Sequence, residues 1–139
     1  MEMLYKRRIN YYETDAMKVV HHSNYIRFLE EARIYLMDKM GLPYSKLEEE
    51  GIMIPVIGVQ CTYKHSAKFD DLIEIKVTIR EYTGVKLVVG YEIINKTNND
   101  LLVLTGETKH CFTNKEMKPI SLKRINPKIH EIFLNSFNE

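Results

Sequence analysis

The sequence predicts an α+β domain in which a curved antiparallel sheet of about five strands wraps around one long helix. Two observations carry this prediction. Apolar residues first recur at three- and four-residue steps, as on one face of a helix, and later alternate every second residue in four segments. Those later segments follow one another through short links, and consecutive strands with short connections are antiparallel. One helix with a wide apolar face is expected to pack across such a sheet.

The first two expected elements are a strand over residues 4–12 and the long helix over residues 23–40. Ser23 is the expected N-cap of the helix, because its hydroxyl can accept an otherwise unpaired backbone N–H. At the other end, Gly41 can adopt the left-handed conformation that ends a helix, and Pro43 blocks its continuation. The apolar stripe of this helix consists of Tyr25, Phe28, Leu29, Ala32, Leu36 and Met40.

A short helical turn, four further strands and a C-terminal helix are expected after residue 43. Ser45 and Glu48 have the spacing of a capping box and indicate the start of the turn. Asn126 followed by Pro127 is typical of a helix start and predicts the C-terminal helix. The four strand segments, each with alternating apolar residues, are 57–63, 73–79, 85–93 and 101–113.

The composition is that of a single globular domain over residues 1–139, with 45% hydrophobic and 28% charged residues. The net charge is +1, which offers no basic face for nucleic acid. No apolar run is long enough to span a bilayer and the N-terminus does not resemble a signal peptide, so we expect a cytoplasmic protein. Cys61 and Cys111 both lie in strand segments, which favours two reduced core thiols over a disulfide.

The residues that point to chemistry lie between 11 and 25. Asp15 and His22 stand seven residues apart, just before the expected helix start. Asp15 precedes Ser23 by eight residues, which is too far for its side chain to cap that helix. The first N–H groups of the helix are unpaired where its macrodipole is positive, so they can stabilise a developing negative charge. This segment therefore predicts a reaction centre.

The same segment resembles the motif of the hotdog-fold acyl-CoA thioesterases, in particular the 4-hydroxybenzoyl-CoA thioesterase and Tol–Pal-associated (YbgC-type) branch. The parts that carry the resemblance are Tyr12-Glu13-Thr14-Asp15, Val19-Val20, His22-Ser23-Asn24-Tyr25, Ala67 to Ile75 and Met117-Lys118-Pro119. The resemblance covers roughly residues 5–122. It implies a hotdog fold, assembly into a homodimer or homotetramer, and hydrolysis of an acyl-CoA to a free acid and coenzyme A. It implies neither metal nor cofactor, with coenzyme A present only as part of the substrate.

The resemblance also implies roles for two residues. Asp15 matches the catalytic carboxylate, and it can either attack the thioester directly or deprotonate a water molecule. His22 matches the motif histidine, whose backbone N–H is the oxyanion donor in the family. Its imidazole can orient water, protonate the leaving thiolate or position the substrate. We expect no metal site, because no second group of ligands has zinc-like spacing.

Seven further residues are candidates for binding the substrate. Tyr12 and Tyr25 can contribute hydroxyl groups, and Met17 can line an apolar pocket for the acyl group. Lys18 stands where the family commonly has glycine or another small residue, so its backbone is expected to adopt a strained angle. Lysines at strand ends and turns can bind the phosphates of coenzyme A. The lysine candidates are Lys64, Lys86 and Lys118, with Lys68 as a further one.

Two alternatives to thioester hydrolysis stay open. One is a hotdog hydratase or dehydratase, although such enzymes place their histidine and acid on different elements. The other is a non-catalytic module that binds acyl thioesters, which the unusual Lys18 keeps in consideration. We further expect Glu13 to be an exposed strand-end residue and His21 to point away from His22. The length and the aromatic or aliphatic nature of the acyl group, and the choice between coenzyme A and acyl-carrier protein, are not readable from the sequence.

Overall fold

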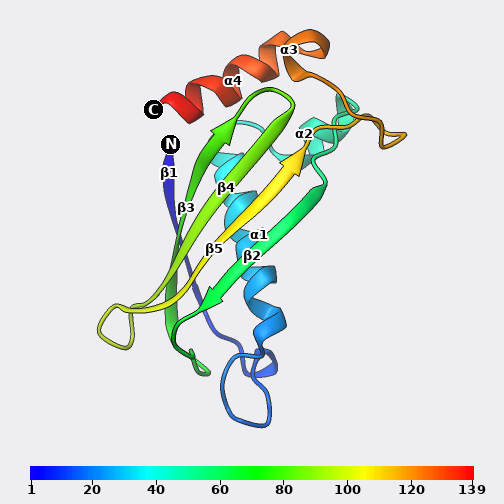
Figure 1. The fold of residues 1–139 in the computed structure, drawn as a ribbon. Coiled ribbons are helices and arrows are strands. Elements are labelled where there is room, and N and C mark those ends of the chain that lie inside the picture. Colours follow the sequence, from blue (N-terminus) through cyan, green and yellow to red (C-terminus); the bar gives the residue numbers. More distant parts are fainter.

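One five-stranded antiparallel sheet, in the order β1-β3-β4-β5-β2, forms the body of the protein in a computed structural model that describes residues 1–139. The strands are β1 (Glu2–Arg8), β2 (Val56–Tyr63), β3 (Leu72–Tyr82), β4 (Lys86–Asn95) and β5 (Leu101–Cys111). The sheet curves in front of the long helix α1 (His22–Lys39), which runs along one of its faces (Figure 1). The expected α+β architecture is therefore confirmed.

The side chains between α1 and the sheet are buried because the strands alternate as predicted. In β3, Ile73, Ile75 and Val77 have no exposed surface, whereas the residues between them are partly accessible on the outer face. Phe28 and Leu29 of α1 belong to the same core cluster and are equally buried. Each such side chain contributes about 1.5–3 kcal/mol on burial, so this face holds α1 firmly against the sheet.

The remaining short elements gather at opposite ends of the sheet (Figure 1). At one end lie α2 (Tyr44–Glu49), α3 (Leu122–Ile125) and α4 (Pro127–Asn138); at the other lie the 3-10 turn η1 (Tyr11–Glu13) and the loop over residues 14–20. The start of α4 confirms its predicted cap, because Asn126 Oδ1 accepts the Ile129 N–H at 3.2 Å. The sequence did not predict α3. None of the helices combines the length and apolar character needed to cross a membrane.

The predicted start of the long helix is wrong. The helix begins at His22, and its N-cap is His21, whose Nδ1 accepts the Ser23 N–H at 3.2 Å. The Ser23 hydroxyl is bonded to the same nitrogen at 2.8 Å, so Ser23 cannot cap the helix itself. His21 acts as the cap because the Glu13 carbonyl accepts its N–H at 2.9 Å and holds it in an extended conformation.

Two other boundaries also differ from the prediction. The first strand ends at Arg8 rather than residue 12, because the chain turns at Asn10, whose N–H donates to the Glu13 carboxylate at 2.7 Å. The short helix begins at Tyr44 without a side-chain cap, so the expected capping box at Ser45 is absent. The prediction for the cysteines is confirmed to the extent that both thiols are free.

Candidate active site

Residues 14–20 form a tight hairpin that carries the candidate catalytic acid. Thr14 and Val20 pair as an antiparallel bridge, and the Asp15 N–H donates to the Val19 carbonyl at 2.9 Å. The Lys18 N–H donates back to the Asp15 carbonyl, also at 2.9 Å. A three-residue hairpin loop of this kind places its last residue in the left-handed region. Asp15 thus stands at the first position of a closed, backbone-bonded turn.

Lys18 occupies that left-handed position with φ at 65°, which confirms the strained backbone angle expected for it. A residue with a Cβ atom pays about 1 kcal/mol for this conformation, whereas glycine does not. The side chain of Lys18 is exposed at the tip of the loop and does not line the pocket described below. The structure therefore accommodates lysine here at a local cost without altering the turn.

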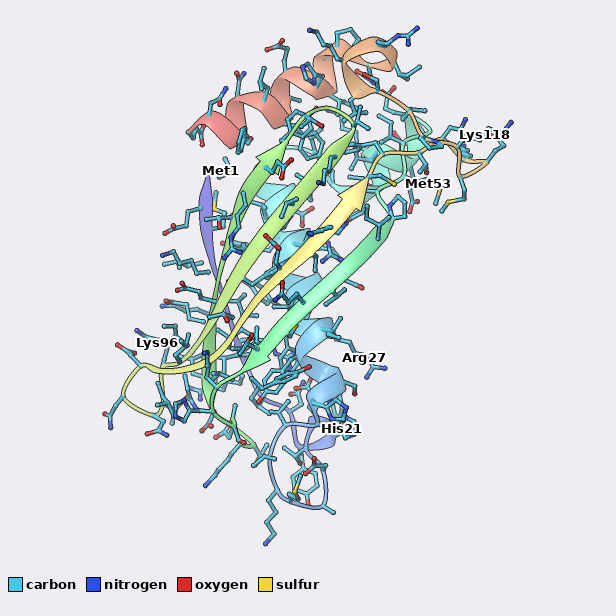
Figure 2. All side chains as sticks on the ribbon, viewed as in Figure 1. Met1, His21, Arg27, Met53, Lys96 and Lys118 are labelled. Atoms are coloured by element: carbon cyan, nitrogen blue, oxygen red, sulfur yellow. The ribbon has the colours of Figure 1, made fainter.

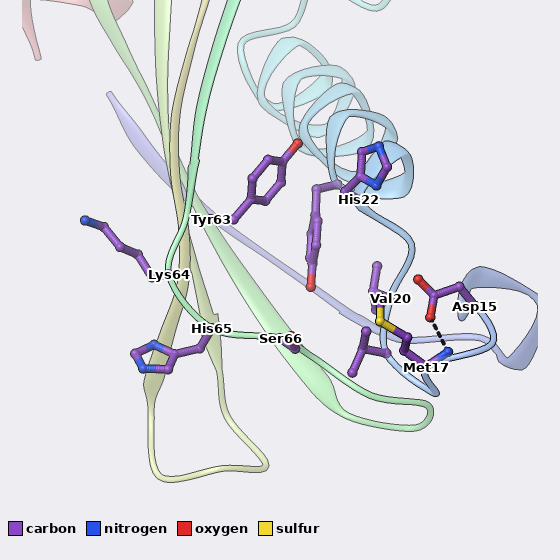
Figure 3. A pocket seen from close by; sticks show the side chains of 10 residues that line it. Asp15, Met17, Val20, His22, Tyr63, Lys64, His65 and Ser66 are labelled. Atoms are coloured by element: carbon purple, nitrogen blue, oxygen red, sulfur yellow. Dashed lines mark hydrogen bonds between the residues drawn. The ribbon is translucent and has the colours of Figure 1, made fainter.

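The Asp15 carboxylate is held by one oxygen and free at the other. Oδ1 accepts the Met17 N–H at 2.8 Å, a contact shown by the dashed line in Figure 3. No protein donor reaches Oδ2, and the side chain is half-buried. One oxygen thus orients the group while the other can attack a carbonyl carbon or take a proton from water.

The start of α1 supplies a backbone donor without an acceptor in the protein. The His21 N–H is bonded to the Glu13 carbonyl and the Ser23 N–H to the His21 ring, but the His22 N–H between them donates to no protein group. The positive end of the helix macrodipole adds to its preference for a negative oxygen. The two imidazole rings of His21 and His22 stack at 4.4 Å, so the expectation that they point apart is wrong.

A pocket of about 250 Å³ lies between this hairpin, the start of α1 and the chain that leaves β2. Figure 3 shows Asp15, Met17 and His22 on one side of it, and Tyr63 and His65 on the other. The pocket-lining residues are Asp15, Met17, Val19, Val20, His22, Tyr25, Tyr63, Lys64, His65 and Ser66. The structure therefore brings together five of the predicted site residues, namely Asp15, Met17, His22, Tyr25 and Lys64.

Three other predicted residues lie outside the pocket, besides Lys18. Tyr12 is 81% exposed, and its hydroxyl accepts a hydrogen bond from the Asn10 side chain at 3.1 Å. Lys86 begins β4 opposite Cys111, and Lys118 lies beyond β5, so both are at the end of the sheet opposite to His21 (Figure 2). The strands β3 to β5 that connect the two ends contain ten or more residues, and each residue adds about 3.3 Å to the distance between the ends. The arrangement of a single chain thus gives no support to these residues as ligands for the substrate.

Tyr25 is one of the pocket residues, yet its hydroxyl is already committed. It accepts the Ala67 N–H at 3.2 Å, and the ring is 4% exposed. Burial raises the pKa of the Tyr25 hydroxyl, against the opposing effect of that N–H, so the group stays neutral. Tyr25 therefore joins α1 to the segment after β2.

Of the pocket residues at and after the end of β2, the sequence predicted Lys64 but not Tyr63, His65 or Ser66. Tyr63 packs its ring 5.7 Å from that of Tyr25, and His65 and Ser66 complete the wall. The hairpin reaches this segment through the Val20 N–H, which donates to the Ala67 carbonyl at 2.9 Å. Nothing local to residues 63–66 indicates this role, because it depends on a contact between segments more than 40 residues apart.

Glu13 is also placed differently from the prediction. It is 6% exposed and forms an ion pair with Arg7, so it is not a solvated strand-end residue. The turn at Asn10 directs its side chain inward, where the strand expected over 4–12 would have let it point to solvent. No group of three or more His, Cys, Asp or Glu side chains is arranged to hold a metal ion.

Comparison with known proteins identifies the relatives of this chain. Residues 9–132 match the model of the thioesterase-like superfamily. The acyl-CoA thioester hydrolase YbgC of Escherichia coli O6:H1 is 31% identical, with 84% of this chain and 87% of the relative aligned. The solved structure of a DHNA-CoA thioesterase from Staphylococcus aureus has a TM-score of 0.90 at 31% identity and covers 96% of this chain and 89% of its own. A hypothetical protein from Aquifex aeolicus has a TM-score of 0.84 at 33% identity, with 94% and 98% covered.

Proposed function

The chain belongs to the thioesterase-like superfamily, and we propose that it is an acyl-CoA thioesterase that hydrolyses an acyl-CoA to a free acid and coenzyme A. The observation that carries the proposal is that the free oxygen of Asp15 and the unpaired N–H of His22 belong to residues of one pocket. A thioester carbonyl needs both an attacking oxygen and a donor for its developing oxyanion. The names of the relatives support the same reaction.

Asp15 would act in one of two ways. As a nucleophile, its Oδ2 bonds to the carbonyl carbon, the C–S bond breaks with release of the thiolate, and water then hydrolyses the mixed anhydride. As a general base, Oδ2 takes a proton from the water molecule that attacks the same carbon. In both routes the oxyanion accepts a hydrogen bond from the His22 N–H, and the exposed His22 imidazole can donate a proton to the leaving sulfur. Neither route uses a metal or a cofactor.

The walls of the pocket suit the two parts of the substrate. Met17, Val19 and Val20 offer an apolar surface to the acyl group. Lys64 and His65 lie on the β2 side, and Figure 3 shows the Lys64 side chain directed away from Asp15. A cation in this position suits the phosphates of coenzyme A better than the reacting carbonyl. We therefore assign Lys64 to the nucleotide part of the substrate.

The test measures release of free thiol from short and long aliphatic acyl-CoAs and from aromatic acyl-CoAs. We expect Asp15→Asn to lower kcat by about 10²–10⁴-fold, the usual contribution of a general base or nucleophile. Asp38→Asn, an exposed aspartate on α1, is the matched control and should keep the wild-type rate. A chelator is expected to leave the rate unchanged.

Three results would contradict the proposal. Equal rates for wild type and Asp15→Asn would remove Asp15 from the chemistry. Saturable binding of acyl-CoA without release of thiol would indicate a non-catalytic module, and hydration of an enoyl thioester would indicate a hydratase. The acyl-CoAs with the highest kcat/KM would identify the acyl class.

For the assembly, we infer that a second copy of the chain covers β2. This strand is at the edge of the sheet and exposes Ile57 by 59% and Val59 by 45%. An edge with unpaired backbone groups and apolar side chains favours pairing with another strand. Light scattering should give a multiple of 16.4 kDa, and the double variant Ile57→Glu with Val59→Glu should give the single-chain mass. A wild-type protein of single-chain mass would contradict the inference.

A further inference from the structure

Glu13 is bonded to both segments that supply the candidate catalytic groups. Its carboxylate Oε1 accepts hydrogen bonds from the Arg7 guanidinium and from the Asn10 N–H, the latter at 2.7 Å. Its backbone carbonyl accepts the His21 N–H and the Asn24 side-chain amide, both at 2.9 Å. One buried residue thus connects β1, the turn before the hairpin and the first turn of α1.

The carbonyl of Glu13 determines which N–H of the helix start stays free. It takes the His21 N–H, and the His21 ring takes the Ser23 N–H, which leaves only the His22 N–H between them without an acceptor. The Asn24 amide bonded to the same carbonyl keeps the first turn of α1 in place. A shift of Glu13 would therefore either move the His22 N–H, which is the proposed oxyanion donor, or provide it with an acceptor in the protein.

The same residue also determines where Asp15 lies. Asp15 follows Glu13 by two residues, and the bridge between Thr14 and Val20 transmits any displacement directly into the hairpin. Because the hairpin is closed by its own backbone bonds, it moves as a unit. The separation between the Asp15 carboxylate and the His22 N–H thus depends on the position of Glu13.

Arg7 makes that position rigid. Its Nη1 donates to Glu31 of α1 at 2.7 Å, and its guanidinium carbon lies 4.2 Å from the centre of the Phe28 ring. The side chain of Arg7 is 11% exposed and that of Glu13 is 8% exposed. A planar guanidinium can bind two carboxylates in fixed directions, which a lysine ammonium cannot. Arg7 therefore links Glu13 to Phe28 and Glu31 in the second and third turns of α1.

We propose that Glu13, held by Arg7, is a positioning residue for thioester hydrolysis that sets the Asp15 carboxylate against the His22 N–H. This rests on the proposed function. A displacement of about 1 Å in such a constellation can lower the rate about 10²-fold. The role differs from that of an ordinary structural ion pair, because a structural pair would change stability but not the turnover of the folded protein.

The experiment compares Glu13→Ala with Glu13→Gln and with the control Glu74→Ala. Glu74 pairs with Lys6, the neighbour of Arg7 on β1, at 3.6 Å on the outer face of the sheet. We expect Glu13→Ala to lower kcat by about 30–100-fold with KM changed less than about threefold. The amide oxygen of glutamine can still accept both hydrogen bonds, so Glu13→Gln should restore kcat to within about fivefold of wild type. Glu74→Ala should match wild type.

Thermal unfolding and the amide NMR signals of Asp15 and His22 are recorded for each variant. Wild-type kcat in folded Glu13→Ala would overturn the proposal, as would an equal loss in Glu74→Ala. If Glu13→Ala does not fold, Glu13→Asp replaces it in the test, because its side chain is shorter by one methylene but keeps the carboxylate. We expect Glu13→Asp to lower kcat by about tenfold. An unchanged kcat in this variant would overturn the proposal. If the wild type hydrolyses no acyl-CoA, the proposed function fails. The positioning role then depends on the amide signals, which must shift in the Glu13 variant but not in the control.

Discussion

Arg7 of β1 and Arg33 of α1 are both largely removed from solvent, and their charges are compensated in different ways. Arg7 meets two carboxylates, those of Glu13 and Glu31, next to the candidate active site. Arg33, 7% exposed, has no acidic partner; its Nη1 donates to the Tyr91 hydroxyl at 3.0 Å, and its Nε is buried without an acceptor. One arginine thus forms a cluster with two opposite charges, whereas the other begins a chain of uncharged groups.

The chain that begins at Arg33 ends at His110. Arginine can only donate, so the Tyr91 hydroxyl oxygen accepts from Arg33; Tyr91 is bonded to Thr108 Oγ1 at 2.7 Å, and Thr108 Oγ1 to His110 Nε2 at 2.8 Å. The other ring nitrogen of His110, Nδ1, is buried without a hydrogen-bond partner. Burial and the charge of Arg33 lower the pKa of His110 to about 4, although the carbonyls of Ile54 and Pro55 oppose the shift. A doubly protonated His110 ring can only donate, so Thr108 Oγ1 would have to accept from Nε2.

The structural role of a buried cation depends on the groups that it contacts. Through the two carboxylates, Arg7 links β1 to η1, which precedes the hairpin, and to α1. Near Arg33, burial and the charge of the arginine instead keep His110 neutral and leave the region sensitive to acid. Removal of one charged partner should therefore destabilise the cluster around Arg7. Protonation of His110 should destabilise the chain that begins at Arg33.

The largest effect is expected from Arg7→Met, which leaves the buried Glu13 carboxylate without its cation. Breaking such a buried pair costs about 3–5 kcal/mol of unfolding free energy. Lys6→Met is the control, since Lys6 is 57% exposed and its pair with Glu74 contributes about 0–1 kcal/mol. Urea unfolding of the two variants measures the difference. Equal losses would show that Arg7 is no more important than a surface lysine.

An intermediate effect is expected from acid. In the unfolded chain His110 binds its proton near pH 6.5, but in the folded protein only near pH 4, so its contribution is complete above pH 6.5 and is lost as the pH falls towards 4. Between pH 7 and pH 5 the unfolding free energy should fall by about 2 kcal/mol from this residue. Over the same pH range, the unfolding free energy of His110→Gln should fall by about 2 kcal/mol less than that of wild type. Parallel pH curves for the two proteins would contradict the inferred neutral histidine.

The smallest effect is expected from Arg33→Met. Replacing a buried charge that lacks a counter-ion by an apolar side chain of similar length is commonly neutral or stabilising, within about 1 kcal/mol. The Tyr91 hydroxyl keeps its bond to Thr108 in this variant. Urea unfolding beside Arg7→Met gives a direct comparison of the two arginines. A loss as large as that of Arg7→Met would mean that a group outside this chain, such as a carboxylate of a second copy, pairs with Arg33.

Local pattern determined most of the fold. The helical period over residues 23–40, the alternation in the four later strand segments and the Asn126-Pro127 start of the last helix all depend on neighbours within a few positions. Such patterns report which face of an element is buried, and one long helix with successive strands leaves few ways to pack. The family motif likewise identified Asp15 and His22, because both belong to one continuous segment.

The tertiary structure decided what depends on residues distant in sequence. Glu13 is buried because Arg7 of β1 pairs with it while Glu31 of α1 binds the same arginine. The segment after β2 becomes a pocket wall because the hairpin bonds to Ala67. Lys64 lies at the pocket and Lys86 does not, although both are charged residues near strand ends. Periodicity specifies the buried face of an element but not which end of the sheet a given strand end reaches. That information exists only in the contacts between elements.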